Sequence, residues 1–231
     1  MTETEIKTIE VRGHKLRVGI RRGEHPPLLL FNGIGANLEL FEPVTAALDG
    51  IETIVFDVPG VGGSPSRWRP YRLWELARLA DRMLTQLGYH GPVDVLGLSW
   101  GGALAQQFAR SYPKRCRRLV LAATTAGALM VPGSPSVMRK MLSPRRYKDP
   151  DHLTRIAPDL YGGELRRNPA LIAAHREHLG RPHWRGYLHQ QLAIVGWTSL
   201  WWLSMLRQPT LVLAGKDDPL VPLINRTSWP G

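Results

Sequence analysis

Ser99 stands where an apolar run gives way to a helical pattern, a setting that suits a catalytic nucleophile. Residues 93–98 are mostly apolar, Gly97-Leu98-Ser99-Trp100-Gly101 follows the G-x-S-x-G pattern, and residues 103–110 have helical spacing. A serine hydroxyl is a weak nucleophile at neutral pH, so it must be exposed and must have a base beside it. A sharp strand–turn–helix bend gives that exposure, because the flanking glycines let strand and helix approach closely. We therefore predict a nucleophile elbow at Ser99; a plain Gly/Ser turn is the alternative.

Acyl transfer from serine also needs N–H groups that hold the developing oxyanion. The residue after the nucleophile supplies one of them in this arrangement, and the loop after an earlier buried strand supplies the other. Residues 32–35 read Asn-Gly-Ile-Gly and follow the apolar run of residues 27–31. We predict that the backbone N–H groups of Ile34 and Trp100 form the oxyanion hole.

The acid of the triad is expected on a loop beyond the serine, because the chain order here is serine, acid, histidine. Residues 209–215 form a buried-strand pattern, and Asp217 and Asp218 follow it directly. We predict that Asp218 is the acid, with Asp217 as the alternative. Asp57 also ends an apolar run, but it precedes the serine and is expected to hold its own loop.

The histidine is the difficulty, since none follows Asp218. Three of the eight histidines lie in predicted turns, and the other five lie in a long insertion. We expect the five insertion histidines to be solvent-facing or locally hydrogen-bonded. We therefore predict that the catalytic histidine is absent from this chain; an insertion histidine that swings over Ser99 is the alternative. In chain order they are His14, His25, His90, His152, His175, His178, His183 and His189.

The surrounding elements alternate between strand and helix patterns. We predict strands at residues 6–10, 16–20, 27–31, 51–56, 93–98, 118–123 and 209–215, and helices at 38–48, 71–87 and 103–110. This alternation predicts an α/β fold with a mostly parallel, doubly wound sheet. Residues 127–207 are too long for a loop and contain only short helical patterns, which indicates an inserted cap. The core would then comprise residues 1–126 and 208–231.

Four tryptophans of the cap, Trp184, Trp197, Trp201 and Trp202, have two interpretations. Trp197 and Trp201 are four residues apart, a spacing that predicts one buried helix face. We favour a role in the cap core over contact with an aliphatic substrate.

The amino-acid composition further limits the kinds of protein that this chain could be. The 231 residues carry a formal net charge of +11 and include one cysteine. No apolar run is long enough for a membrane span, and no signal peptide is visible, so we expect a cytoplasmic protein without a transmembrane segment. The single Cys116 fits a reducing compartment; it is expected to be a structural junction residue, although its basic neighbours could lower its pKa. The basic residues form no nucleic-acid motif, so they predict a solvated basic face or attraction to an anionic surface. No pattern indicates a cofactor or a metal.

Longer strings of residues give a more specific resemblance than G-x-S-x-G. The chain resembles the α/β-hydrolases, and within them the intracellular depolymerases of medium-chain-length poly(3-hydroxyalkanoate). The resemblance runs from about residue 25 to Asn225 and is strongest in Asn-Gly-Ile-Gly-Ala-Asn and Ser-Trp-Gly-Gly-Ala-Leu-Ala-Gln-Gln-Phe. The segments that carry it are residues 30–40, 56–64, 99–108, 143–147, 155–158, 161–163 and 196–199.

The resemblance implies a serine hydrolase that acts on stored polyester granules in the cytoplasm and releases 3-hydroxyalkanoic acids or oligomers. It implies Ser99 as nucleophile and Asp218 as acid, and it gives no position for the histidine. After Asn225 the sequence departs from the family pattern, so the last strand, the histidine loop and the final helix are expected to be missing. Two other hypotheses stay open: an inactive protein of the same fold, and an esterase or lactonase for small soluble esters. The oligomeric state is not predicted.

Overall fold

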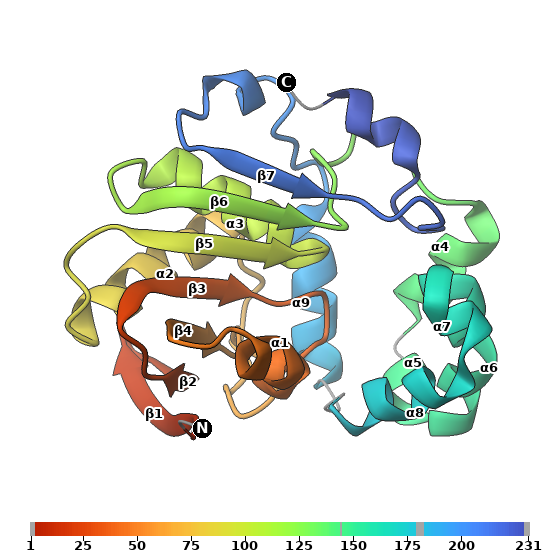
Figure 1. Cartoon of the computed structure of the whole chain (residues 1–231), viewed down its shortest axis with the longest axis horizontal. Helices are drawn as coiled ribbons and strands as arrows, with labels where there is room; N and C mark the ends of the chain where they lie inside the picture. The colour runs from red at the N-terminus through yellow and green to blue at the C-terminus, as the bar shows by residue number, and fades with distance from the viewer. Residues whose placement is uncertain (1–2, 144, 179–182, 229–231) are drawn as a thin grey trace.

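A seven-stranded sheet forms the centre of the computed structural model, which describes residues 3–143, 145–178 and 183–228. The strand order is β1-β2-β4-β3-β5-β6-β7 (Figure 1). β1 and β2 form an antiparallel hairpin, β2 pairs antiparallel with β4, and all the other pairs are parallel. The mostly parallel α/β sheet expected from the sequence is therefore confirmed. The strands are β1 Glu5–Val11, β2 His14–Arg21, β3 His25–Phe31, β4 Ile51–Phe56, β5 Val93–Leu98, β6 Cys116–Ala122 and β7 Thr210–Leu213.

Strand β3 lies at the centre because both of its faces are apolar. Leu28, Leu29, Leu30 and Phe31 are all buried, and they pair with β4 on one side and β5 on the other. Alternate residues serve opposite faces, so Leu29 and Phe31 belong to one core cluster while Leu28 and Leu30 belong to the other. A strand that is buried on both faces reads as a continuous apolar run, which is why the sequence pattern revealed it.

Helices cover both faces of the sheet. The buried sides of α2 (Leu73–Gln86) and α3 (Trp100–Ser111) fill the larger core cluster. On the other face the sequence pattern predicted one helix over residues 38–48, whereas the structure has η1 (Leu38–Phe41) followed by α1 (Glu42–Ala47). The break falls at Pro43, which lacks an N–H donor and is favoured in the first turn of a new helix.

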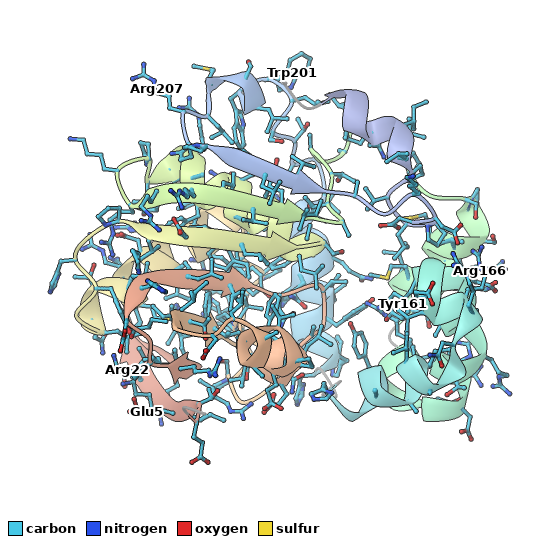
Figure 2. The ribbon with its side chains drawn as sticks, viewed as in Figure 1. Glu5, Arg22, Tyr161, Arg166, Trp201 and Arg207 are labelled. Carbon is cyan, nitrogen blue, oxygen red and sulfur yellow. The ribbon has the colours of Figure 1, made fainter. Side chains whose placement is uncertain are left out.

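Beyond the carboxyl ends of the strands, short helices form a separate layer (Figure 1). Tyr161 lies on the side of this layer that faces the sheet, and Arg166 lies on the outer side (Figure 2). Helix α9 instead returns alongside the sheet. The division into core and cap at residues 126 and 207 stays a prediction. The helices are α4 Pro135–Leu142, α5 Arg145–Lys148, α6 Pro150–Tyr161, α7 Gly163–Arg167, α8 Pro169–Glu177, α9 Trp184–Ile194, η2 Leu203–Met205 and η3 Leu223–Ser228.

The helix face expected for Trp197 and Trp201 does not form, so that prediction is wrong. Helix α9 ends at Ile194, and Gly196 then takes a left-handed φ of 72°, which turns the chain away. Trp201 is 77% exposed, whereas Trp197 donates through Nε1 to Gln107 Oε1 at 2.9 Å and lies edge-on to Trp202. Trp184, more than half exposed, is not a core residue either.

Candidate active site

Ser99 sits directly after β5, with a backbone that three hydrogen bonds hold in place. Its φ of 53° and ψ of −118° lie in a region that L-residues rarely adopt. The Ser99 N–H donates to the Ala122 carbonyl at 2.8 Å, and the Ser99 carbonyl accepts from the Gly102 N–H and the Thr124 hydroxyl. This geometry is that of the nucleophile elbow expected from the sequence.

Two glycines permit the tight bend. A Cβ on Gly101 would collide with the carbonyl oxygen of Phe31 at the end of β3, and one on Gly97 would collide with the Gly101 carbonyl. Helix α3 can therefore begin almost in contact with the sheet. Because Trp100 is the first residue of α3, its N–H has no partner within the helix.

Ile34 lies beside Ser99 in one pocket. Within the described ranges, neither the Ile34 N–H nor the Trp100 N–H has an acceptor, so both are available to a ligand. The roles assigned to these two groups stay predictions, and the geometry is compatible with them.

Side chains from α5 and α9 fix the loop that contains Ile34. The Ile34 carbonyl accepts from the Tyr147 hydroxyl and from Arg146 Nη2, the latter at 3.3 Å. The next N–H, that of Gly35, donates to Gln190 Oε1 at 2.7 Å. The sequence offered no signal for these contacts, since they join residues that are 112, 113 and 155 positions apart.

Asp218 lines the same pocket from the loop after β7. Its Oδ1 accepts from the N–H groups of Leu220 and Val221, both at 2.9 Å. Burial raises the pKa of the carboxyl, and these two N–H donors oppose that rise. The other oxygen, Oδ2, has no donor among the described residues.

Asp217, the alternative acid, and Asp57 both form their contacts away from the Ser99 pocket. Asp217 is exposed and binds Arg166 at 3.2 Å as well as the Gly163 N–H. Asp57 is buried and accepts from the N–H groups of Leu38 and Gly63, so it holds its own loop as expected. Its pKa is raised by burial, against these donors and Arg17. Of these three aspartates, Asp218 is the one that lines the Ser99 pocket, and its role as the acid stays a prediction.

No histidine lines this pocket in the parts of the chain that the structure describes. His189 is buried, but its ring lies edge-on to Tyr71 with the centroids 5.9 Å apart. His178 lies 3.8 Å from Glu42, and the side chain of His175 lies outside the described residues. The predicted absence of a catalytic histidine stays a prediction, and the pocket offers nothing against it.

Cys116 is the first residue of β6 and is buried. Burial raises the pKa of its thiol to about 12, so the basic neighbours do not activate it. It is a structural residue at a strand end, as the sequence favoured.

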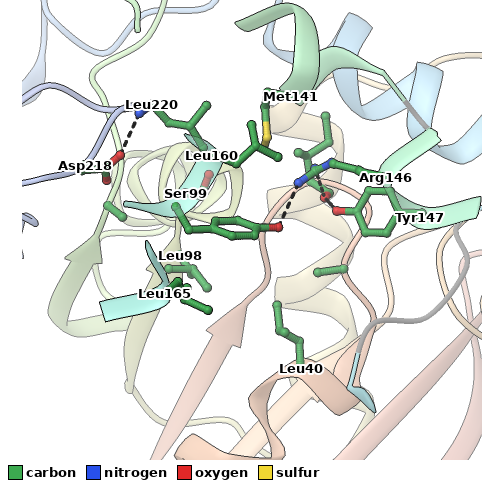
Figure 3. Close-up of a pocket in the computed structure, with 15 residues that line it drawn as sticks. Leu40, Leu98, Ser99, Met141, Arg146, Tyr147, Leu160, Leu165, Asp218 and Leu220 are labelled. Atoms are coloured by element: carbon green, nitrogen blue, oxygen red, sulfur yellow. Dashed lines mark hydrogen bonds between the residues drawn. The ribbon is translucent and has the colours of Figure 1, made fainter. Parts of the chain in front are cut away.

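The pocket itself has a volume of about 270 Å³ and a mostly apolar wall. Figure 3 shows Ser99 between Asp218 on one side and Arg146 with Tyr147 on the other. Leucines and Met141 provide much of the remaining wall. A nucleophile, two available N–H groups, a carboxylate and an apolar wall suit acyl transfer from an aliphatic ester.

The fold and this site place the chain in a known class. The α/β hydrolase fold model matches residues 26–230, and the chain belongs to that family. A hydrolase from Pseudomonas aeruginosa PA01 superposes with a TM-score of 0.78, at 24% identity over 97% of this chain and 85% of that one. The enol-lactonase from Burkholderia xenovorans LB400 superposes with a TM-score of 0.77, at 24% identity over 96% of this chain and 86% of that one.

One sequence relative points to a more specific class of hydrolase. The chain is 56% identical over 222 residues to a poly(3-hydroxyalkanoate) depolymerase of Ectopseudomonas oleovorans, which covers 95% of this chain and 78% of that protein. The resemblance inferred from the sequence strings is thereby confirmed. The sequence relative and the fold together show that this chain is a carboxylic ester hydrolase.

No described helix is long and apolar enough to cross a membrane. The same residues contain no cluster of three or more histidine, cysteine, aspartate or glutamate side chains that could hold a metal ion.

Proposed function

We propose that this chain hydrolyses the ester bonds of medium-chain-length poly(3-hydroxyalkanoate) through an acyl-enzyme on Ser99. The observation that carries the proposal is the position of Ser99 in an apolar pocket, beside the available N–H groups of Ile34 and Trp100. The printed name of the Ectopseudomonas relative supports the polymer as substrate. An apolar wall suits the aliphatic side chains of such a polyester.

The reaction would proceed in two steps. Ser99 Oγ attacks the ester carbonyl carbon, the oxyanion is held by the two N–H groups, and the acyl C–O bond then breaks to release the alcohol. Water next attacks the acyl-serine ester, which releases the acid and restores the hydroxyl. Asp218 would orient the group that receives the Ser99 proton.

Among the described residues, no histidine lines the pocket to receive that proton. The same observation favours a second candidate, a protein of this fold that binds esters but turns them over hardly at all. Loss of one triad member can reduce turnover about as much as loss of all three, on the order of a millionfold.

We further propose that the protein works in the cytoplasm at the surface of polyester granules. The relative's name supports the polymer, and a net charge of +11 suits attraction to an anionic particle surface.

Hydrolysis of p-nitrophenyl octanoate tests the function, with Ser99→Ala as the matched variant. We expect a Ser99-dependent rate, which added imidazole raises by acting as an external base. Equal background rates for both proteins, with and without imidazole, would refute the catalytic proposal and favour the inactive candidate. Acid release from purified granules then tests the substrate: activity on soluble esters without release from granules would favour an esterase or lactonase.

A further inference from the structure

Arg146 is a buried cation beside the Ser99 pocket. Its side chain lines that pocket, and the residue is only 3% exposed. Nη1 donates to the Tyr161 hydroxyl at 3.4 Å and Nη2 donates to the Ile34 carbonyl at 3.3 Å. The guanidinium carbon lies 4.4 Å from the centre of the Tyr147 ring and 6.0 Å from that of Tyr187. All four partners are neutral.

A counter-ion for this charge is missing from the described ranges. None of their carboxylates lies within ion-pair distance of Arg146, and the buried Nε–H has no acceptor there. The guanidinium cannot lose its proton in a protein. Burial of an uncompensated charge costs several kcal/mol, so buried arginines are normally paired with acids.

The position of the Arg146 guanidinium indicates what kind of group would balance its positive charge. Arg146 projects from α5 of the cap into the pocket, on the side away from Asp218 (Figure 3). The pocket is the space through which an anion could reach it. Nη1 and Nη2 each carry a second N–H beside the one already used, and a planar guanidinium has the donor geometry that a carboxylate accepts.

The hydrogen bonds that hold the Ile34 loop do not by themselves require a positive charge at residue 146. The neutral Tyr147 hydroxyl already donates to the same Ile34 carbonyl, and Gln190 holds the adjacent N–H. The loop is thus held by neutral donors and acceptors as well, so the charge of Arg146 is available for ligand recognition.

We infer that Arg146 binds a carboxylate of the substrate, so that the preferred substrates are esters whose alcohol portion carries a free carboxylate. The inference rests on the proposed polyester hydrolysis. The matching polymer end is R–CO–O–CHR′–CH₂–COO⁻. Attack by Ser99 forms the Ser–O–acyl bond and breaks the acyl C–O bond; the serine proton ends on the leaving oxygen. HO–CHR′–CH₂–COO⁻ departs, and water releases R–COOH from the serine. The chain is thus shortened from its carboxyl end.

Ligand affinity tests the inference without requiring turnover. The probes are 3-hydroxyoctanoate and its neutral amide, titrated calorimetrically into the full chain. We expect wild type to bind the carboxylate at least about tenfold more tightly than the amide, as one charge-assisted contact implies. Arg146→Gln should abolish that ratio and Arg146→Lys should retain part of it.

Tyr147→Phe is the matched control. It removes a donor to the Ile34 carbonyl but leaves the Arg146 charge, so the preference for the carboxylate should persist. Equal affinity of wild type for the two probes would overturn the inference, as would a ratio that persists in Arg146→Gln. If that variant does not fold, Arg146→Lys decides, because an undiminished ratio there would contradict recognition by the guanidinium fork.

The outcome is separable from that of the proposed function. A Ser99-dependent rate with no carboxylate preference would leave the ester hydrolase standing and refute the role of Arg146. A carboxylate preference without turnover would support the role of Arg146 and refute the proposed ester hydrolysis.

Discussion

At the scale of single residues, Ser99, the proposed nucleophile, has a strained backbone. Its φ of 53° and ψ of −118° form a conformation that is open to glycine but costs other residues about 1–3 kcal/mol. Ser99→Gly should therefore raise the free energy of unfolding by roughly 1 kcal/mol, because glycine relieves that strain. Ser99→Ala keeps a Cβ in the same conformation and should leave stability near that of wild type. Urea unfolding of the three proteins measures this, and a Ser99→Gly protein no more stable than Ser99→Ala would contradict it.

His189 makes stability depend on pH. Burial, followed by the positive charges of Arg67 and Arg185, lowers its pKa below the ordinary value of 6.5. The unfolded chain then binds a proton more readily than the folded protein, so stability is present above about pH 6.5 and declines as the pH falls below it. His189→Gln should flatten that decline. Thermal melts between pH 7.5 and 5.5 provide the measurement, with the exposed His90→Gln as control; an unchanged slope in His189→Gln would count against this account.

At the scale of elements, α9 contacts the loop after β4 directly through its backbone at Gly186. Gly186 lies against Gly60, and a Cβ at residue 186 would overlap the Gly60 backbone. Glycine to alanine normally stabilises a helix by about 0.5–1 kcal/mol. Here Gly186→Ala should instead destabilise the protein by roughly 1–3 kcal/mol, since the helix must move outward. Gly91→Ala, where a Cβ meets open space, is the control for chemical denaturation; a stabilised Gly186→Ala would show that α9 is not in close contact.

The loop that carries Ile34 depends on the same helix. Gln190 is 1% exposed, and it is the acceptor for the Gly35 N–H. Gln190→Met would leave that N–H buried without a partner, which should cost roughly 1–3 kcal/mol of stability. The neighbouring Gln191 donates from an exposed position to the Leu142 carbonyl, so Gln191→Met should change stability by less than about 0.5 kcal/mol. Equal effects of the two substitutions on the unfolding midpoint would exclude a structural role for the Gly35 contact.

Elements with strong local patterns were predictable from the sequence, and contacts between distant segments were not. Mostly apolar runs revealed β3, β4 and β5, and the pattern is strongest in β3, whose last four residues are apolar and buried on both faces of the sheet. The elbow followed from glycines next to a serine. The contacts of Arg146 and Gln190 with the Ile34 loop could not be predicted from local sequence patterns, since they join residues 112 and 155 positions apart. The i, i+4 spacing of Trp197 and Trp201 led to a wrong prediction of a buried helix face. Helix α9 ends before either residue, and Gly196 then turns the chain.

At the scale of the whole molecule, charge and exposed apolar side chains compete as explanations for surface attachment. The net charge is +11, and many arginines are exposed, while Trp68 is 88% and Trp201 77% exposed. Arg207 and Trp201 even lie at the same end of the molecule (Figure 2). Electrostatic attraction weakens as added salt shortens the screening length to about 3 Å at 1 M, whereas burial of apolar surface does not weaken in this way.

Salt dependence therefore separates the two contributions. We expect the protein to sediment with polyester particles coated with phosphatidylglycerol at low salt and to be released from them as salt is raised, because its charge is strongly positive at pH 7. Particles coated with phosphatidylcholine serve as the neutral control and should retain little protein at any salt concentration. Equal, salt-resistant binding to both coatings would assign attachment to the exposed tryptophans, and the proposed electrostatic attraction to granules would then be wrong.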